Sequence, residues 1–267
     1  MSLRTTLGRF RQSRDDMNVR NGLAYRLLAL VVLATSWAVA AEEPPVLKAL
    51  VVFGKFKGEL PGVDAPPAWA EDIFDPERPG SVSHFYDEMS FGQHRVRGEI
   101  APRWYAAEQT AEYYAADNRL EKGKFSELAL DILQKADRDI DFARFDNDGP
   151  DGIPNSGDDN GIADIVFLVM ASIPRNVLIG AATGISHLGF AEIYETSDWG
   201  AKGRPIRVHP DRGTLQQGRT FAETVGIMCH EYGHVLGLTD LYDVDFIAQA
   251  EPRSPEDDSA GIGKWGL

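Results

Sequence analysis

Residues 220–240 read TFAETVGIMCHEYGHVLGLTD, and this stretch organises the rest of the chain. Thr220 followed by Glu223 is a capping box, in which the threonine side chain accepts from the Glu223 amide and the glutamate reaches back to the amide of the cap residue. The box predicts a helix that begins at Phe221. Gly237 predicts its end, because glycine readily adopts the left-handed conformation that terminates helices.

Two histidines lie one turn apart in this predicted helix. His230 and His234 are four residues apart, so both imidazoles project from one face and can bind one metal ion. Glu231 can reach a water on that metal without occupying a ligand position. Gly237 lets the chain turn, so Asp240 can return a carboxylate as third ligand. A bare HExxH arises by chance in on the order of one chain in a hundred, but the extended pattern H-E-x-x-H-x-x-G-x-x-D is much rarer, which argues against incidental histidines.

This set of residues predicts zinc-dependent hydrolysis of protein or peptide substrates. Zn²⁺ with three protein ligands keeps one position open for water and lowers the pKa of that water to about 7. Glu231 is the candidate general base, which takes the proton of the water and returns it to the leaving amine. Cys229 projects about 100° away from His230 around the helix, so we expect a buried, inert thiol rather than a redox group or a zinc ligand.

The composition limits the partners of the chain. Its 267 residues include 27 Lys+Arg and 41 Asp+Glu, a formal net charge of −14. A chain this acidic repels nucleic acid and anionic membranes, so we expect neither as a partner. Cys229 is the one cysteine of the sequence, so no disulfide can form within it. Nothing in the sequence indicates an oligomeric state.

The first 41 residues have the pattern of a secretory signal peptide. Arginines precede an apolar run at residues 27–37, and the small residues AVAA follow at 38–41. The apolar run is shorter than the ~20 residues that a membrane-spanning helix needs. We therefore expect cleavage after Ala40 or Ala41 rather than an uncleaved anchor. This predicts a secreted protein that has no membrane attachment after cleavage.

Between the leader and the histidine helix, apolar patterns predict strands and helices in one core. Apolar runs predict buried strands at 46–53 and 162–170. Apolar residues at i, i+3, i+4, i+7, i+8 and i+11 from Phe125 predict an amphipathic helix over 125–136. Weaker patterns predict a loop at 61–79, a helix at 81–89, and strands at 91–100, 184–195 and 205–209. Mixed strands and helices give an α/β or α+β fold class.

Residues 146–164, DNDGPDGIPNSGDDNGIAD, crowd many carboxylates together. Oxygen ligands on a flexible backbone are what Ca²⁺ requires, and a bound cation would relieve their mutual repulsion. The spacing is not that of an EF-hand, because Pro150 and Gly157 stand at loop positions 5 and 12. We expect a structural calcium site, with a solvated acidic loop as the alternative. The candidate ligands are Asp146, Asp148, Asp151, Asp158, Asn160 and Asp164.

The sequence around the two histidines resembles the immune inhibitor A-like (M6) metallopeptidases. The segment His230–Asp243, HEYGHVLGLTDLYD, is similar to the zinc-binding segment of that family, and residues 81–92, 145–164 and 261–267 are similar to other family segments. The resemblance implies a secreted bacterial zinc endopeptidase with a metzincin-like architecture, a mixed twisted sheet accompanied by the active-site helix. It also implies the roles of four residues: His230, His234 and Asp240 as zinc ligands and Glu231 as catalytic base.

The resemblance also implies how the chain is divided. Residues 42–236 would form an N-terminal catalytic subdomain that ends with the zinc-binding helix, and residues 237–267 would begin a C-terminal subdomain. Residues 261–267 resemble the approach to the methionine turn of the family, so we expect the sequence to stop just before that turn, with the C-terminal subdomain incomplete and activity low. Thr239 stands where family members usually carry proline.

A second function remains open from the sequence. The chain could be a secreted, calcium-stabilised binding domain on a metalloprotease scaffold, inactive because its zinc site is incomplete. The intact Glu231 argues against this alternative. The remaining histidines are expected to be structural or exposed: His84, His94, His187 and His209.

Overall fold

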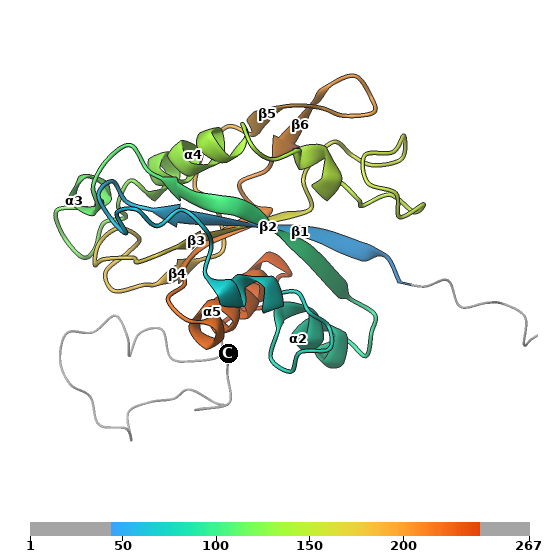
Figure 1. Ribbon diagram of the computed structural model, residues 1–267, viewed down its shortest axis with the longest axis horizontal. Helices are drawn as coiled ribbons and strands as arrows, with labels where there is room; N and C mark the ends of the chain where they lie inside the picture. The colour runs from blue at the N-terminus through green and yellow to red at the C-terminus, as the bar shows by residue number, and fades with distance from the viewer. Residues whose placement is uncertain (1–43, 241–267) are drawn as a thin grey trace, which may run out of the picture. The chain divides into compact units, whose positions relative to one another are not determined.

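The computed structural model describes residues 44–240, and a five-stranded sheet lies at their centre (Figure 1). The strand order is β2-β1-β3-β7-β4, with β4 antiparallel to β7 at one edge and the other pairs parallel. The strands are β1 Val46–Lys55, β2 Arg95–Ala106, β3 Ile165–Met170, β4 Gly184–Ile185 and β7 Gly213–Gln217. A separate antiparallel pair consists of β5 Tyr194–Trp199 and β6 Pro205–Val208.

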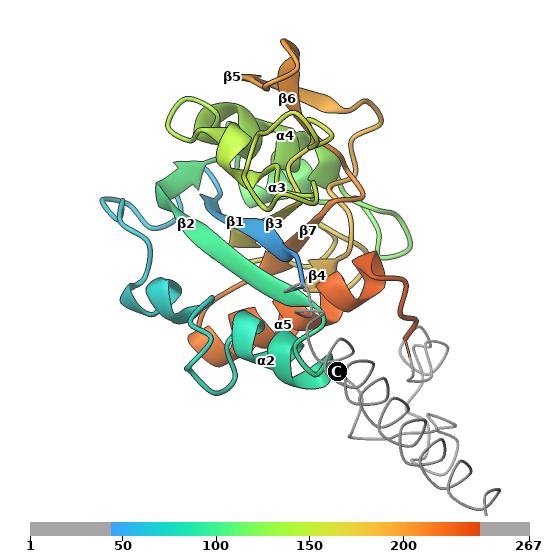
Figure 2. The same ribbon diagram turned by 90° about the vertical axis from the view of Figure 1, so that its right-hand side faces the viewer.

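Helices cover both faces of the sheet. Figures 1 and 2 show α4 on one face and α2 and α5 on the other. The α-helices are α2 Val82–Met89, α3 Ala111–Tyr114, α4 Phe125–Ala136 and α5 Phe221–Val235, and short 3-10 helices span Ala68–Asp72 and Phe142–Phe145. A mixed sheet between helices confirms the expected mixed α/β class.

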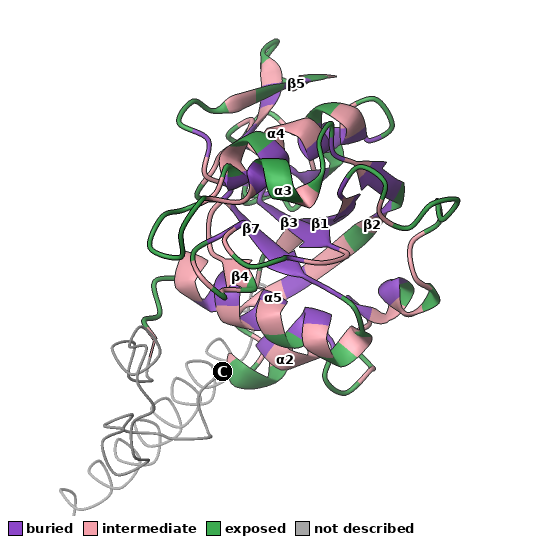
Figure 3. Cartoon of the chain, turned by 90° about the vertical axis from the view of Figure 1, so that its left-hand side faces the viewer, coloured by how far each residue is buried: buried purple, intermediate pink, exposed green. Residues whose placement is uncertain are grey.

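Two apolar cores lie on the two sides of the sheet. Successive side chains of a strand point to opposite faces. Leu50 and Val52 of β1 therefore join the core under α4, whereas Val51 and Phe53 join the core under α2 and α5. Burial on both faces explains why β1 and β3 read as continuous apolar runs. Figure 3 shows buried residues concentrated along β1, β3 and β7.

The amphipathic helix predicted over 125–136 is confirmed as α4, with the same bounds. Its apolar stripe faces the sheet, and its solvent side is polar. All six residues of the predicted stripe are buried: Phe125, Leu128, Ala129, Ile132, Leu133 and Ala136.

Several predicted strand bounds are wrong. The strand predicted at 91–100 begins only at Arg95, because Phe91 and Gly92 have φ of +54° and +73° and form a turn. The strand predicted at 162–170 begins at Ile165. Of residues 184–195, β4 takes two and β5 begins at Tyr194. Strand β7, with the polar sequence GTLQQ, lacks the apolar pattern that would have predicted it.

Helix α2 is bonded to α5 through buried aromatic side chains. The Tyr86 hydroxyl donates to the carbonyl oxygen of Cys229 at 2.8 Å. The Tyr86 ring also packs edge-on against Tyr232, with 5.1 Å between ring centroids. The Tyr232 hydroxyl lies 2.9 Å from His94 Nε2 just before β2. These contacts hold the middle of α5 against both α2 and the sheet.

Among residues 44–240, no helix has the length and apolar character needed to cross a membrane. The predicted signal peptide at 1–41 lies outside the described residues, as does nearly all of the predicted C-terminal subdomain at 237–267.

The Tyr86 hydroxyl should contribute measurably to stability. We expect Tyr86→Phe to lower the free energy of unfolding by about 1 kcal/mol, because the Cys229 carbonyl loses a buried donor. Urea unfolding followed by circular dichroism measures the change. Tyr113→Phe is the matched control, since its hydroxyl donates to Glu127 at an exposed site. Equal stability of Tyr86→Phe and the wild type would contradict this role.

Candidate metal centre

Helix α5 begins and ends close to where the sequence predicts. Thr220 is the N-cap, and its side chain accepts from the Glu223 amide at 3.3 Å. The reciprocal half of the predicted capping box is wrong, because the Glu223 carboxylate accepts from the Arg219 amide at 2.9 Å instead of the Thr220 amide. The adjoining Arg219 guanidinium lowers the pKa of Glu223 to about 2. The helix ends at Val235, and Gly237 follows with φ of +91°.

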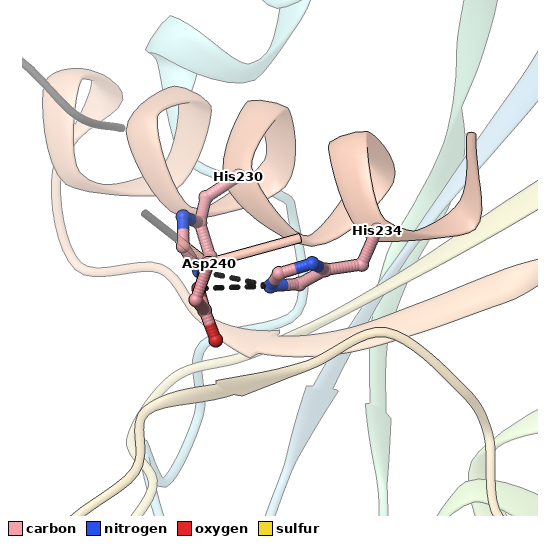
Figure 4. A group of neighbouring side chains, drawn as sticks. All are labelled: His230, His234 and Asp240. Atoms are coloured by element: carbon pink, nitrogen blue, oxygen red, sulfur yellow. Dashed lines mark hydrogen bonds and ion pairs between the residues drawn. The ribbon is translucent and has the colours of Figure 1, made fainter. Parts of the chain in front are cut away.

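The left-handed turn returns Asp240 to the face of α5 that carries both histidines (Figure 4). His230 Nε2 and His234 Nε2 are 3.2 Å apart. Asp240 Oδ1 lies 3.4 Å from His230 Nε2 and 3.3 Å from His234 Nε2. The three candidate zinc ligands therefore meet at one point, and all three side chains are partly buried.

The donor atoms fit a tetrahedral metal ion. Zinc–nitrogen bonds of about 2.0–2.1 Å in tetrahedral geometry place neighbouring ligand atoms about 3.3 Å apart, which matches the observed separations. His234 Nδ1 lies 2.9 Å from the Leu238 carbonyl, which can only accept, so Nδ1 carries the proton and Nε2 presents its lone pair to the metal. Asp240 Oδ1 is buried and has no hydrogen-bond partner, as expected of an oxygen that binds a cation.

Glu231, the candidate base, is buried between α5 and the sheet, with 7% of its surface exposed. Burial raises the pKa of its carboxyl to about 7; His234 opposes the rise, and the nearby Asp240 carboxylate adds to it. A carboxyl group with a pKa near neutrality can both accept and release a proton at physiological pH.

Cys229 is a buried thiol, as predicted. It is 2% exposed and packs in the core between α5 and the sheet. Burial raises the pKa of the thiol to about 12, so the reactive thiolate form is scarce at neutral pH.

The acidic loop contains a second cluster of carboxylates. Asp146, Asp148 and Asp164 each place an oxygen within 4.8 Å of the others. Burial is the largest cause that raises the pKa of Asp146 and of Asp164 to about 6. Asp146 Oδ1 and the neighbouring Asn147 Oδ1 are buried without a hydrogen-bond partner. The Arg212 guanidinium, 3.3 Å from Asp148 Oδ2, offsets part of the negative charge.

The other three residues predicted as calcium ligands hold the loop together. Asp158 Oδ2 accepts from the Asp151 amide at 3.2 Å. The Asp151 side chain in turn accepts from the Ile153 amide at 2.8 Å. The Asn160 amide donates to Asp148 Oδ1 at 3.1 Å. Three of the six predicted calcium ligands, Asp146, Asp148 and Asp164, therefore lie together in the structure. The other three form hydrogen bonds within the loop.

None of the other four histidines joins a metal-binding group within residues 44–240. His94 stacks on Tyr232, His187 packs its ring against Phe125, and His209 Nδ1 accepts from the Asp211 amide at 3.2 Å. His84 lies in the first turn of α2, where its amide donates to the Ser81 side chain at 3.0 Å.

Comparison with known proteins agrees with this geometry. Residues 70–256 match the family described as immune inhibitor A peptidase M6, catalytic domain. The chain belongs to the M6 peptidase family. The match confirms the resemblance, and it covers both the acidic loop and α5.

Two curated M6 relatives are similar to this chain. Immune inhibitor A of Bacillus thuringiensis subsp. alesti is 27% identical over an aligned length of 193 residues, and the alignment covers 64% of this chain and 27% of that protein. Pre-pro-metalloprotease PrtV of Vibrio cholerae is 26% identical over an aligned length of 185 residues, and the alignment covers 65% of this chain and 20% of PrtV. The matched region therefore spans about a quarter or less of the relatives' length.

Asp240 should be essential for metal affinity. We expect Asp240→Ala in the full chain to weaken zinc binding by more than the roughly 10–100-fold that loss of an outer-shell partner costs. Zinc content after dialysis, measured by atomic emission, gives the change.

Asp211→Ala is the matched control, because this exposed carboxylate also lies beside a histidine, 3.9 Å from His209. It should keep all of its zinc. Full zinc retention by Asp240→Ala would point to a different carboxylate as third ligand.

Proposed function

We propose that this M6 domain is the catalytic part of a secreted zinc endopeptidase that acts on extracellular proteins, with Glu231 as general base. The observation that carries the proposal is the convergence of three ligand atoms: His230 Nε2, His234 Nε2 and Asp240 Oδ1 lie 3.2–3.4 Å from one another. The buried Glu231 carboxyl lies on the same helix as the two histidines. The names of the two relatives support it, since one is a metalloprotease and the other gives its name to a peptidase family.

The chain's own residues divide the work of hydrolysis. When bound, zinc supplies a Lewis acid that makes water nucleophilic near neutral pH. His230, His234 and Asp240 would hold the ion. The Glu231 carboxylate accepts the proton of the attacking water and then donates it to the amine of the departing peptide. Burial raises the pKa of the Glu231 carboxyl, which strengthens it as a base.

Further parts of the proposal rest on the sequence. Secretion rests on the predicted signal peptide at residues 1–41. The subdomain division at residue 236 and the metzincin-like architecture rest on the family, and the sheet with an active-site helix packed on one face is compatible with both.

The alternative, an inactive binding domain on the same scaffold, has less support. A scaffold released from catalysis has no need to keep a buried carboxylate beside its metal ligands, because burial of an ionisable group is costly. Glu231 is nonetheless present and buried.

Substitution of the base separates these functions. We expect Glu231→Gln to keep its zinc but to lose peptide hydrolysis by about 100-fold or more, because the ligands stay and proton transfer is lost. Casein cleavage and zinc content measure the two effects. Glu223→Gln, on the same helix, is the control and should cleave normally. Equal cleavage by Glu231→Gln and the wild type would refute Glu231 as base.

We also propose a structural Ca²⁺ at Asp146, Asp148 and Asp164. The unpartnered oxygens of Asp146 and Asn147 support it, because buried acceptors are otherwise costly. The site would stabilise the start of the central sheet. Asp164 Oδ2 accepts from the Lys48 amide at 2.8 Å, and Asn147 Nδ2 donates to the Val46 carbonyl at 2.7 Å.

Calcium should therefore stabilise the folded chain. Extracellular calcium modules have Kd values of about 0.1–1 mM, so about 10 mM Ca²⁺ should raise the free energy of unfolding by roughly 1.4–2.7 kcal/mol. Thermal unfolding with Ca²⁺ or with chelator measures the shift.

Asp146→Asn should abolish most of the calcium-dependent shift, whereas Asp151→Asn, a control in the same loop, should keep it. If millimolar Ca²⁺ leaves the melting curve of the wild type unchanged, residues 146–164 are a solvated acidic loop and not a calcium site.

A further inference from the structure

We propose that Gly184 and Gln216 form a seat that positions the Glu231 carboxylate for proton transfer. Gly184 lies in the edge strand β4, and Gln216 lies beside it in β7. The proposal rests on the proposed function, in which Glu231 is the base. Gly184 and Gln216 are positioning residues, since they act through Glu231 and not on the substrate.

Gly184 is a glycine because Glu231 occupies the space of its missing side chain. A Cβ added at residue 184 would lie 2.3 Å from Glu231 Oε1 and 2.9 Å from Glu231 Cδ. It would also lie 2.7 Å from Ile227 Cγ2 on the same helix. Gly184 has no positive φ, so the close approach of the carboxylate, and not the backbone conformation, excludes a side chain here. The β4 backbone is therefore in direct contact with the candidate base.

Gln216 supplies a polar group to the same place. Gly184 and Gln216 are partners in the β4–β7 ladder. Leu215 of β7 joins the core under α4, so its neighbour Gln216 faces the α5 side of the sheet. Side chains of paired residues stand about 4.5–5.5 Å apart at Cβ. The Gln216 amide thus lies next to the space that Gly184 leaves open and Glu231 Oε1 enters.

The Gln216 side chain is buried, and only its amide oxygen has a hydrogen-bond partner. Gln216 has no exposed surface, and its Oε1 accepts from the Thr214 hydroxyl. Its Nε2 has no hydrogen-bond partner. A buried N–H without an acceptor is costly, and the nearby Glu231 carboxylate is a strong acceptor when it is ionised. The proposal therefore assigns Glu231 as the acceptor that the Gln216 amide reaches after its side chain rotates.

The seat restricts where the base can be. Contact with β4 prevents the carboxylate from moving toward the sheet, and a hydrogen bond from the Gln216 amide would hold it against Gly184. A displacement of about 1 Å in a reacting group can lower a rate by about 100-fold. The metal ligands are outside this seat, since none of the three atoms nearest to the added Cβ belongs to His230, His234 or Asp240.

Gly184→Ala tests the seat. We expect kcat for a peptide substrate to fall about 100-fold, with KM changed less than threefold and zinc content unchanged, because the added methyl group meets Glu231 and Ile227 but none of the metal ligands. Gly226→Ala is the matched control: Gly226 is an exposed glycine of α5, and a Cβ there meets nothing within 4 Å. The control should keep the wild-type kcat. Gln216→Leu, which removes only the amide, should lower kcat by about tenfold.

A second background shows whether Gly184 acts through Glu231. Aspartate is one methylene shorter, so Glu231→Asp leaves room for the alanine methyl group. Gly184→Ala should then lower the residual kcat of Glu231→Asp by less than threefold. It should also lower the melting temperature less in that background than in the wild type. The melting temperature needs no activity, and the Ile227 contact is common to both backgrounds.

The outcomes distinguish the seat from the function. An active wild type with an equally active Gly184→Ala variant would overturn the seat alone. So would an equal loss of kcat in the wild-type and Glu231→Asp backgrounds, or a loss of zinc that parallels the loss of kcat. Full activity of Glu231→Gln would instead overturn the proposed function. If Gly184→Ala does not fold, Gln216→Leu with a wild-type kcat overturns the seat.

Discussion

The candidate metal centre depends on the backbone turn at Gly237. Two histidines on one helix supply two ligands at most, and a third must come from outside the helix. The positive φ of Gly237 reverses the chain within a few residues and brings Asp240 Oδ1 to 3.3 Å from His234 Nε2. The same turn places the Leu238 carbonyl against His234 Nδ1, which fixes the tautomer. The left-handed conformation of Gly237 therefore positions Asp240, the third candidate ligand, and also orients the imidazole of His234.

The rest of the fold makes this short segment rigid. Helix α5 packs on the sheet, the Tyr86 hydroxyl bonds to its middle, and β4 lies against its Glu231 side chain. An isolated helix could offer the same ligands, but each binding event would then cost the conformational entropy of ordering the helix and its side chains. Because packing has already fixed the helix, the ligands and the base keep a constant relation to one another.

The sequence predicted the parts whose signals are local. The ends of α5, the bounds of α4 and the convergence of His230, His234 and Asp240 follow from caps, periodicity and spacing within a few residues. Strand β7 was missed because Thr214 and Gln216 are polar yet fully buried. Their burial follows from strand pairing and from α5, and no local pattern contains it. Gly184 was missed for the same reason, since the Glu231 side chain that it accommodates is far away in the sequence.

The bond between Tyr86 and Cys229 also bears on when the centre can form. It joins residues 143 positions apart. Forming this bond, which holds α5 in place, therefore closes a loop that includes most of the described chain. Closing long loops is slow, because their entropy is lost before contacts compensate for it. A ribosome must release α5 before α2 can find its partner. A nascent chain with α2, β1 and the acidic loop already outside the ribosome would still lack the helix that carries His230 and His234, so the candidate site could form only after α5 had emerged.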